Sequence, residues 1–268
     1  MSLRIKKAGR FTAFLLLPLL IAAGVFLGSK YFKISYVSVS GNTTVPEEEI
    51  LELAAVPHDL MIFMLDEDEV KERVERNPIL KVIGVERIFP NKVRIHLVER
   101  EPRVELEFAG GFMILDSEAH ILSISQTTES KLPLIRGVEP TAFVVGQALE
   151  TDEDKKYALS ELLKVLGSQD GFDKIKSIDL SDAKDIVVYH IPDFSIIYGL
   201  PYDLDLKANL ANAIINDCEK QGISGGRIDV RDAANKKGYF SSPQISPSPE
   251  PSLGPSPEPS IENEDENA

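Results

Sequence analysis

The chain has 268 residues, a formal net charge of −14 at pH 7, one cysteine and no tryptophan. This acidic balance, without a basic stripe, argues against a nucleic-acid-binding protein, because a negative surface repels the phosphate backbone. The single cysteine, Cys218, excludes an internal disulfide, so the folded part must be stable without cross-links.

Residues 11–28 form a long apolar run without a charge, FTAFLLLPLLIAAGVFLG. A helix of this length reaches about 27 Å, close to the hydrocarbon thickness of a bilayer. Basic residues stand directly in front of it: Arg4, Lys6, Lys7 and Arg10. The positive-inside rule therefore predicts a cytoplasmic tail over residues 1–10 and export of the chain from Tyr31 onward. A cleavable signal peptide is the alternative, but the run exceeds the usual apolar core of one and no clean cleavage site follows.

Residues 31–101 carry a pattern of short elements. Alternating apolar residues and serines over residues 31–40 predict a strand that ends at Gly41. Thr44 and Asp66 each precede a short amphipathic segment and are the predicted N-terminal caps of two helices. Alternation on both sides of Pro90-Asn91 then predicts a β-hairpin. The predicted order is strand, helix, helix, strand, strand.

The segment after Pro102 mixes short apolar strands with two helices. The predicted strands lie near residues 105–108, 112–115, 121–124, 178–180, 186–189, 194–199 and 228–231. One helix is expected to begin at Thr151, which would cap it. The other spans about residues 204–220, with Leu206, Leu210, Ile214 and a buried Cys218 on its apolar face. From Ser241 the repeated sequence PSPEPS and a lack of apolar residues predict a disordered acidic tail.

This layout resembles the FtsQ/DivIB family of bacterial cell-division proteins, in which a single-span anchor precedes a POTRA (polypeptide-transport-associated) domain and a β domain. The resemblance rests on residues 87–95 (RIFPNKVRI), on Val98-Glu99-Arg100-Glu101-Pro102, and on Tyr198-Gly199 before a helix bearing Lys207. At Leu115–Leu122 the chain departs from the family, because Ala119 and His120 replace the region of a turn glycine.

The resemblance implies an α+β fold in successive parts. A transmembrane helix over residues 11–28 would lead into a β-α-α-β-β POTRA domain over residues 31–101. A mixed α/β domain, the β domain, would follow over residues 102–240, and the disordered tail would cover residues 241–268.

The resemblance also implies a non-enzymatic, bitopic scaffold of the division machinery in the cell membrane at the septum, without a cofactor. The implied partners are single-span proteins of the FtsL and FtsB/DivIC types, bound outside the membrane. In the family the last strands of the β domain form the docking surface, and strand addition to a sheet edge is its physical basis. Carried over to this chain, that surface consists of Ile228, Asp229, Val230, Arg231, Gly238, Tyr239 and Phe240.

Two other functions stay open. An exported peptidoglycan hydrolase needs two carboxylates, and Asp203 and Asp205 are candidates, although a place in the first turn of a helix explains them without any chemistry. A POTRA-type transport chaperone predicts a downstream barrel, for which no series of alternating strands follows. No catalytic motif occurs, and the histidines lack metal-ligand spacing: His58, His96, His120 and His190.

Overall fold

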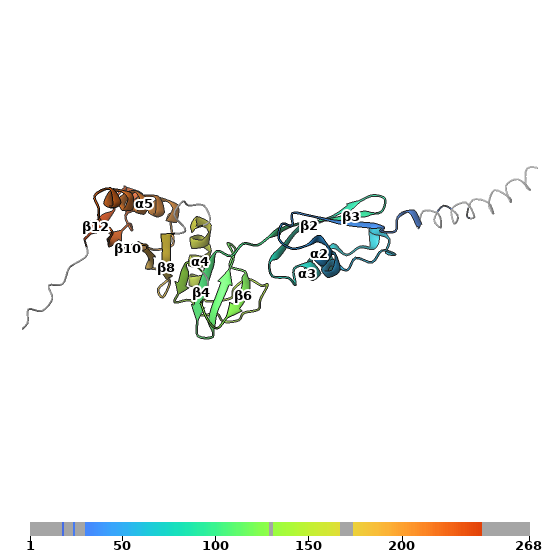
Figure 1. Ribbon diagram of the computed structural model, residues 1–268, viewed down its shortest axis with the longest axis horizontal. Coiled ribbons are helices and arrows are strands. Elements are labelled where there is room, and N and C mark those ends of the chain that lie inside the picture. The colour runs from blue at the N-terminus through green and yellow to red at the C-terminus, as the bar shows by residue number, and fades with distance from the viewer. Residues whose placement is uncertain (1–17, 19–23, 25–29, 129–130, 167–173, 243–268) are drawn as a thin grey trace, which may run out of the picture.

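The computed structural model describes residues 18, 24, 30–128, 131–166 and 174–242, and these residues form two domains with separate hydrophobic cores (Figure 1). None of the helices in these ranges has the length and apolar character needed to cross a bilayer. The predicted anchor over residues 11–28 lies almost wholly outside the described residues, as does the predicted tail from residue 243. Ser241, where that tail was expected to begin, belongs to a strand.

The first domain has the predicted β-α-α-β-β order. Its elements are β1 (Tyr36–Ser40), α2 (Glu47–Ala54), a 3-10 turn η1 (Ile62–Met64), α3 (Glu67–Val74), β2 (Leu80–Ile88) and β3 (Lys92–Glu99). The sheet order is β1-β3-β2, with β1 parallel and β2 antiparallel to β3. Ile50 and Val70 of the helices and Val93 and Ile95 of β3 are fully buried together, so the helices cover one face of this sheet.

The two predicted helix caps differ in outcome. Asp66 caps α3, because its carboxylate accepts the N–H groups of Asp68 and Glu69 at 3.1 Å. The cap predicted at Thr44 is wrong, since α2 begins after Pro46 without a side-chain cap. The N–H of Thr44 instead donates to the carboxylate of Glu99 at 2.7 Å. Glu99 also accepts the N–H groups of Thr43 and Val45, so a residue from the end of β3 holds the start of α2.

This clamp makes the stability of the first domain depend on pH. The N–H groups of Val45 and Thr43 lower the pKa of Glu99 to about 2 from its ordinary 4.5. Its contribution is therefore present above pH 4.5 and is lost as the pH falls toward 2. We expect Glu99→Gln to be clearly less stable than the natural chain at about pH 6, and the difference to shrink by about pH 3. Urea unfolding followed by circular dichroism at both pH values tests this, and an unchanged difference would contradict it.

The second domain contains one long sheet, and two helices cover one of its faces. Its strands are β4 (Val104–Phe108), β5 (Gly111–Leu115), β6 (Ile121–Ser125), β7 (Leu134–Arg136), β8 (Ile175–Asp179), β9 (Ile186–His190), β10 (Asp193–Gly199), β11 (Gly225–Asp229) and β12 (Tyr239–Ser241). The sheet order is β12-β11-β10-β9-β8-β7-β4-β5-β6. The helices are α4 (Glu153–Leu166) and α5 (Leu204–Lys220), and a short 3-10 turn, η3 (Ala233–Asn235), precedes β12.

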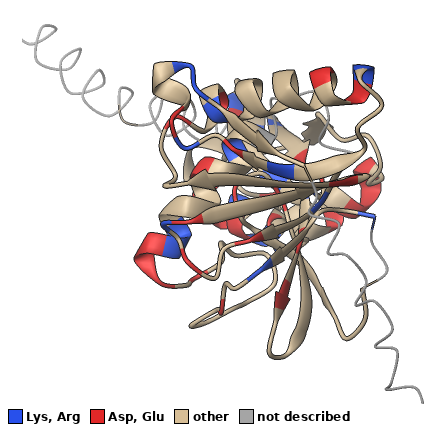
Figure 2. Ribbon diagram, turned by 90° about the vertical axis from the view of Figure 1, so that its left-hand side faces the viewer, with Lys and Arg blue, Asp and Glu red and all other residues tan. Residues whose placement is uncertain are grey.

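Both helices lie on the same face of this sheet (Figures 1 and 2). Ile178, Val188, Ile196 and Ile228 are neighbours in register across β8 to β11 and are buried with α4 and α5 in one core. Because side chains alternate along a strand, the residues between them face the opposite side of the sheet. That side is not covered by a helix of the described chain.

The positions of α4 and α5 agree with those predicted from the sequence, but two predicted details of these helices are wrong. Asp152, rather than Thr151, accepts the first N–H groups of α4, and the hydroxyl of Thr151 donates to the carbonyl of Glu139 at 2.8 Å. On α5, Cys218 is buried as predicted, whereas Leu206 is 50% exposed. The predicted face used residues four apart, from Leu206 to Cys218. Four residues turn about 400° around a helix, so each step shifts the side chain by about 40°, and three steps are enough to leave the buried face. The buried face of α5 consists of Leu204, Lys207, Ala208, Ala211, Ile215 and Cys218.

Ion pairs connect the two domains directly after β3. The guanidinium of Arg100 donates to the carboxylate of Asp116 in the turn between β5 and β6, and also to Glu118 at 3.2 Å. The N–H of Arg100 donates to the carbonyl of Ile79 at 2.6 Å, which ties the same residue to the first domain. Lys81 of β2 reaches Glu118 as well. Two consecutive residues therefore have separate roles: Glu99 stabilises the first domain, and Arg100 stabilises its junction with the second.

Two alanines adopt a left-handed backbone, which suits glycine better. Ala55, at the end of α2, has φ 45° and is exposed, and Ala119 has φ 59° in the turn between β5 and β6. Glycine at residue 55 should relieve a backbone strain of about 1–2 kcal/mol. It also makes the unfolded chain more flexible, which costs about 0.4–1 kcal/mol of stability. The free energy of unfolding of Ala55→Gly should therefore rise by about 0.5–1 kcal/mol. Ala119→Gly should gain less, because the methyl group of Ala119 packs against the core. Urea unfolding measures both, and a loss of stability in Ala55→Gly would contradict the argument.

Candidate partner-binding surface

The seven residues predicted to form a docking surface come together at the β12 end of the long sheet, but only some of them reach solvent. Ile228 and Val230 are 0% exposed and belong to the core. Ile228 lies in β11, which is paired on both sides, with β10 and with β12, and Val230 directly follows that strand. The N–H of Val230 donates to the carbonyl of Ile197 at 3.0 Å. The backbone of β11 thus has no free edge for a partner.

The next two predicted residues form an ion pair. The guanidinium of Arg231 donates to the carboxylate of Asp229, with Nη2 to Oδ2 at 2.6 Å. This contact lowers the pKa of Asp229 and raises the pKa of Arg231. The stem of Arg231 lies against Gly199, where a Cβ atom would be 2.8 Å from Cγ of Arg231. Gly199, one of the residues that carry the family resemblance, therefore meets the predicted docking residue Arg231 in space.

The remaining three residues belong to β12 or precede it. Gly238 lies against α5, since a Cβ atom there would be 2.5 Å from Cδ1 of Ile214. Phe240 packs partly on the core, and Tyr239 is 58% exposed. Tyr239 is thus the predicted docking residue that offers a partner the most exposed apolar side chain.

The outer edge of β12 is the part of this region that can accept another strand. Since the N–H of Val230 is directed at β10, the backbone groups of Asp229 and Arg227 are directed at β12. Their partners Tyr239 and Ser241 therefore point back at β11. The N–H and C=O of Phe240, between them, point outward, where no described strand pairs with them. By the same alternation the N–H of Ser242 is directed outward too.

The other edge of the sheet, at β6, is partly covered. The N–H of Ile121 donates to the carbonyl of Gln147 at 2.9 Å, and the N–H of Gly146 donates to the carbonyl of Ile121 at 2.8 Å. A loop thus occupies backbone groups that an added strand would need. Among the described residues, β12 offers the more open edge of this sheet.

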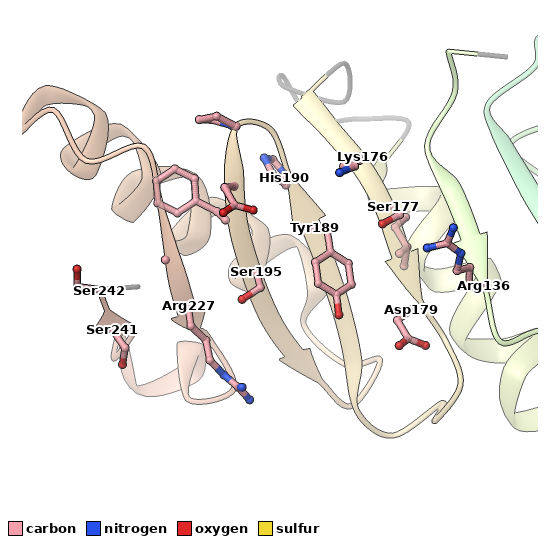
Figure 3. A pocket seen from close by; sticks show the side chains of 15 residues that line it. Arg136, Lys176, Ser177, Asp179, Tyr189, His190, Ser195, Arg227, Ser241 and Ser242 are labelled. Atoms are coloured by element: carbon pink, nitrogen blue, oxygen red, sulfur yellow. The ribbon is translucent and has the colours of Figure 1, made fainter. Parts of the chain in front are cut away.

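A groove of about 810 Å³ runs over the uncovered face of the sheet toward β12 (Figure 3). A row of side chains in register crosses its floor: Ser177, Tyr189, Ser195, Arg227 and Ser241. Lys176 and Arg227 form no ion pair within the described ranges, although the chain as a whole is strongly acidic. Sequence analysis missed this row, because the run IVVYH at residues 186–190 does not reveal which of its sides the helices cover.

The carboxylates considered for a hydrolase lie at the start of α5. Asp203 and Asp205 are both exposed, and Asp203 lines a hollow of about 530 Å³ together with Lys207 and Arg231. The Nζ atom of Lys207 donates to the carbonyl of Leu200 at 2.7 Å, and burial lowers its pKa. Lys207 thereby closes the chain reversal between β10 and α5.

The histidines have different settings. His190 is 6% exposed, and burial lowers its pKa to about 4, so it is neutral at neutral pH. The ligand atoms of Asp116, Glu118 and His120 lie within 4.8 Å of one another, a grouping that the sequence analysis did not anticipate. Arg100 and Lys81 already neutralise the two carboxylates of this group. It is therefore an ion-pair cluster at the domain junction.

Comparison with known proteins identifies the class of protein first. Residues 32–100 match the family described as "POTRA domain, FtsQ-type". This range coincides with the first domain, with its β-α-α-β-β order and its sheet order β1-β3-β2. The first domain is therefore a POTRA domain of the FtsQ type.

The relatives extend the match into the second domain. The cell division protein DivIB of Clostridium tetani is 26% identical over 203 residues, which are 75% of this chain and 76% of that protein. The cell division protein FtsQ of Syntrophotalea carbinolica is 30% identical over 186 residues, 65% of this chain and 63% of that protein. The extracytoplasmic domain of DivIB from Geobacillus stearothermophilus has 13% identity and a TM-score of 0.27, and covers 42% of this chain and 97% of that one. That score is too low to inform the fold. The predicted resemblance is confirmed: the chain is similar to the FtsQ/DivIB cell-division proteins along most of its length.

Proposed function

We propose that this protein is a non-enzymatic, single-span scaffold of the bacterial division machinery. Its bulk lies outside the membrane, at the septum, and it binds single-span partners of the FtsL and FtsB/DivIC types. The observation that carries the proposal is the outer edge of β12, with the outward-directed backbone of Phe240 and the exposed Tyr239.

Strand addition accounts for the choice of this surface. A partner strand beside β12 would satisfy the outward N–H and C=O of Phe240, with which no described strand pairs. The side chain of Tyr239 lies beside that backbone and would contact alternate residues of the partner. The adjoining groove with Lys176 and Arg227 would favour acidic side chains in the part of the partner that crosses the sheet.

Mass spectrometry of what co-purifies with the full-length protein from detergent-solubilised native membranes tests the proposal. We expect two small single-span coiled-coil proteins in amounts comparable to the protein itself. Their absence, with the intact chain recovered, would overturn the scaffold function. Turnover of peptidoglycan that is lost in both Asp203→Asn and Asp205→Asn would instead establish the hydrolase alternative.

A further inference from the structure

An exposed cluster of large apolar side chains lies at one end of the POTRA domain. It combines three segments that are far apart in the sequence: the chain before β1, the η1 turn and the turn between β2 and β3. We call it the aromatic patch, and its members are Tyr31, Phe32, Phe63, Met64 and Phe89. The ring centroids form a chain, with Tyr31 to Phe32 at 5.6 Å, Phe32 to Phe63 at 5.1 Å and Phe63 to Phe89 at 5.4 Å.

Packing within the patch leaves most of its outer surface uncovered. Tyr31 and Met64 are each 64% exposed, and Phe63 and Phe89 are each 57% exposed. Single exposed apolar side chains are ordinary in proteins, but a contiguous group of this kind marks a surface that binds something apolar.

The position of the patch indicates what it binds. Because β1 runs parallel to β3, with Tyr36 opposite Lys92, the chain enters the domain at the same end as the β2–β3 turn. The chain leaves the domain after β3 at the opposite end, toward the second domain (Figure 1). The apolar run over residues 11–28 ends three residues before Tyr31. The patch thus surrounds the point at which an anchored chain would leave the bilayer.

Charge supports the same assignment. The two segments at residues 30–36 and 87–98 contain basic residues and no acid, in a chain with a net charge of −14. The third segment, residues 59–67, brings Asp59, Asp66 and Glu67. Asp66 caps α3, and the pairs of Asp59 with Lys33 and of Glu67 with Arg87, both at 3.1 Å, neutralise acid and base alike. Lys92, at the β2–β3 turn, forms no ion pair with another described residue. Basic side chains around aromatic ones suit the layer of anionic and zwitterionic lipid headgroups.

We propose that the aromatic patch lies in the headgroup layer of the bilayer and makes a second membrane contact beside the anchor. Tyr31 is favoured there, because it keeps an apolar ring toward the acyl chains and its hydroxyl in water. The phenylalanine rings of the patch suit the boundary between headgroups and acyl chains. With two contacts the POTRA domain cannot swing freely on a single chain, and β3 directs the second domain away from the membrane. This proposal rests on the membrane anchor of the proposed function.

The lack of tryptophan in the chain permits a direct test. Single tryptophans are introduced as Phe63→Trp or Phe89→Trp in the full-length protein. The matched control is Ile79→Trp, a 40% exposed position just before β2, about 30 Å from Phe89 along the strand. Each variant is reconstituted in vesicles of phosphatidylcholine and phosphatidylglycerol, with or without bromine on the acyl chains. Flotation reports on the anchor, and quenching by bromine reports on the patch.

We expect all variants to float. Bromine should quench Phe63→Trp and Phe89→Trp at least about twofold and should leave Ile79→Trp nearly unchanged, since it acts only within the bilayer. In the Phe89→Trp chain, an added Met64→Asp should reduce the quenching, because a charge opposes entry into the headgroup layer.

Three results would overturn the proposal in distinguishable ways. A chain that does not float lacks the membrane anchor, and this result would overturn both the proposed membrane localisation and the membrane contact of the aromatic patch. A floating chain whose reporters at 63 and 89 are quenched no more than the control keeps the anchor but has no patch contact. If their emission then shifts to the blue only when native membrane proteins are added, the patch binds a protein rather than lipid.

Discussion

Replacing Asp116 by alanine should lower the free energy of unfolding by about 3–5 kcal/mol, as expected when one partner of a buried ion pair is removed. The side chains of Asp116 and Arg100 are only 4% and 9% exposed. The carboxylate also accepts the N–H groups of Glu118 and His120 at 2.8 Å, so it shapes the turn between β5 and β6. The alanine variant loses the turn contacts and leaves the Arg100 guanidinium buried with Glu118 as its remaining partner.

Two further variants separate these contributions. Asp116→Asn retains an oxygen for the turn but not the charge, so it should lose less than the alanine variant. Lys81→Ala removes a more exposed pair with Glu118 and should cost under about 1 kcal/mol. Urea unfolding of the three variants supplies the comparison. A cost for Asp116→Ala as small as that for Lys81→Ala would show that the junction does not depend on the buried pair.

Local sequence patterns predicted the parts of the fold that local interactions determine. The hairpin of β2 and β3 is marked by alternation on both sides of a Pro-Asn turn, and the structure has it. Asp66 caps α3 because its partners are two and three residues away. The cap at Thr44 failed because α2 begins only after Pro46, and Glu99, 55 residues away, instead fixes the backbone of Thr44 by accepting its N–H.

The docking surface could be predicted only as a region. Alternation at residues 228–231 is visible in the sequence, but the side of the strand that faces the helices depends on the position of α5. The structure buries Ile228 and Val230 and leaves Asp229 and Arg231 on the other face. A proline at Val230 would therefore break the contact with Ile197 and damage the fold before it tested docking. The short strand β12 has too few residues for a pattern, yet it determines which edge is open.

The strongest test of docking is a proline at Ser242. We expect Ser242→Pro to weaken partner binding by at least about tenfold, because it removes an outward N–H worth about 0.5–1.5 kcal/mol and places a ring on the edge. The ladder between β11 and β12 uses the backbone of Tyr239 and Ser241 and should stay intact. Proline also favours an extended conformation of the preceding residue, which a strand already has. Binding is measured by titrating solubilised partner complex onto the immobilised full-length protein.

Matched variants distinguish backbone pairing from loss of a side chain. Ser242→Ala keeps the N–H group and should bind normally. Tyr239→Ala should weaken binding, whereas Tyr36→Ala, at a tyrosine of similar exposure in the first domain, should not. If Ser242→Pro bound the partner normally and its circular dichroism spectrum matched that of the unmutated protein, strand addition at β12 would be excluded. The two variants remove different groups of the same surface, a side chain in Tyr239→Ala and a backbone N–H in Ser242→Pro. If only Tyr239→Ala weakened partner binding, the partner would contact the side chains of this edge without pairing with its backbone.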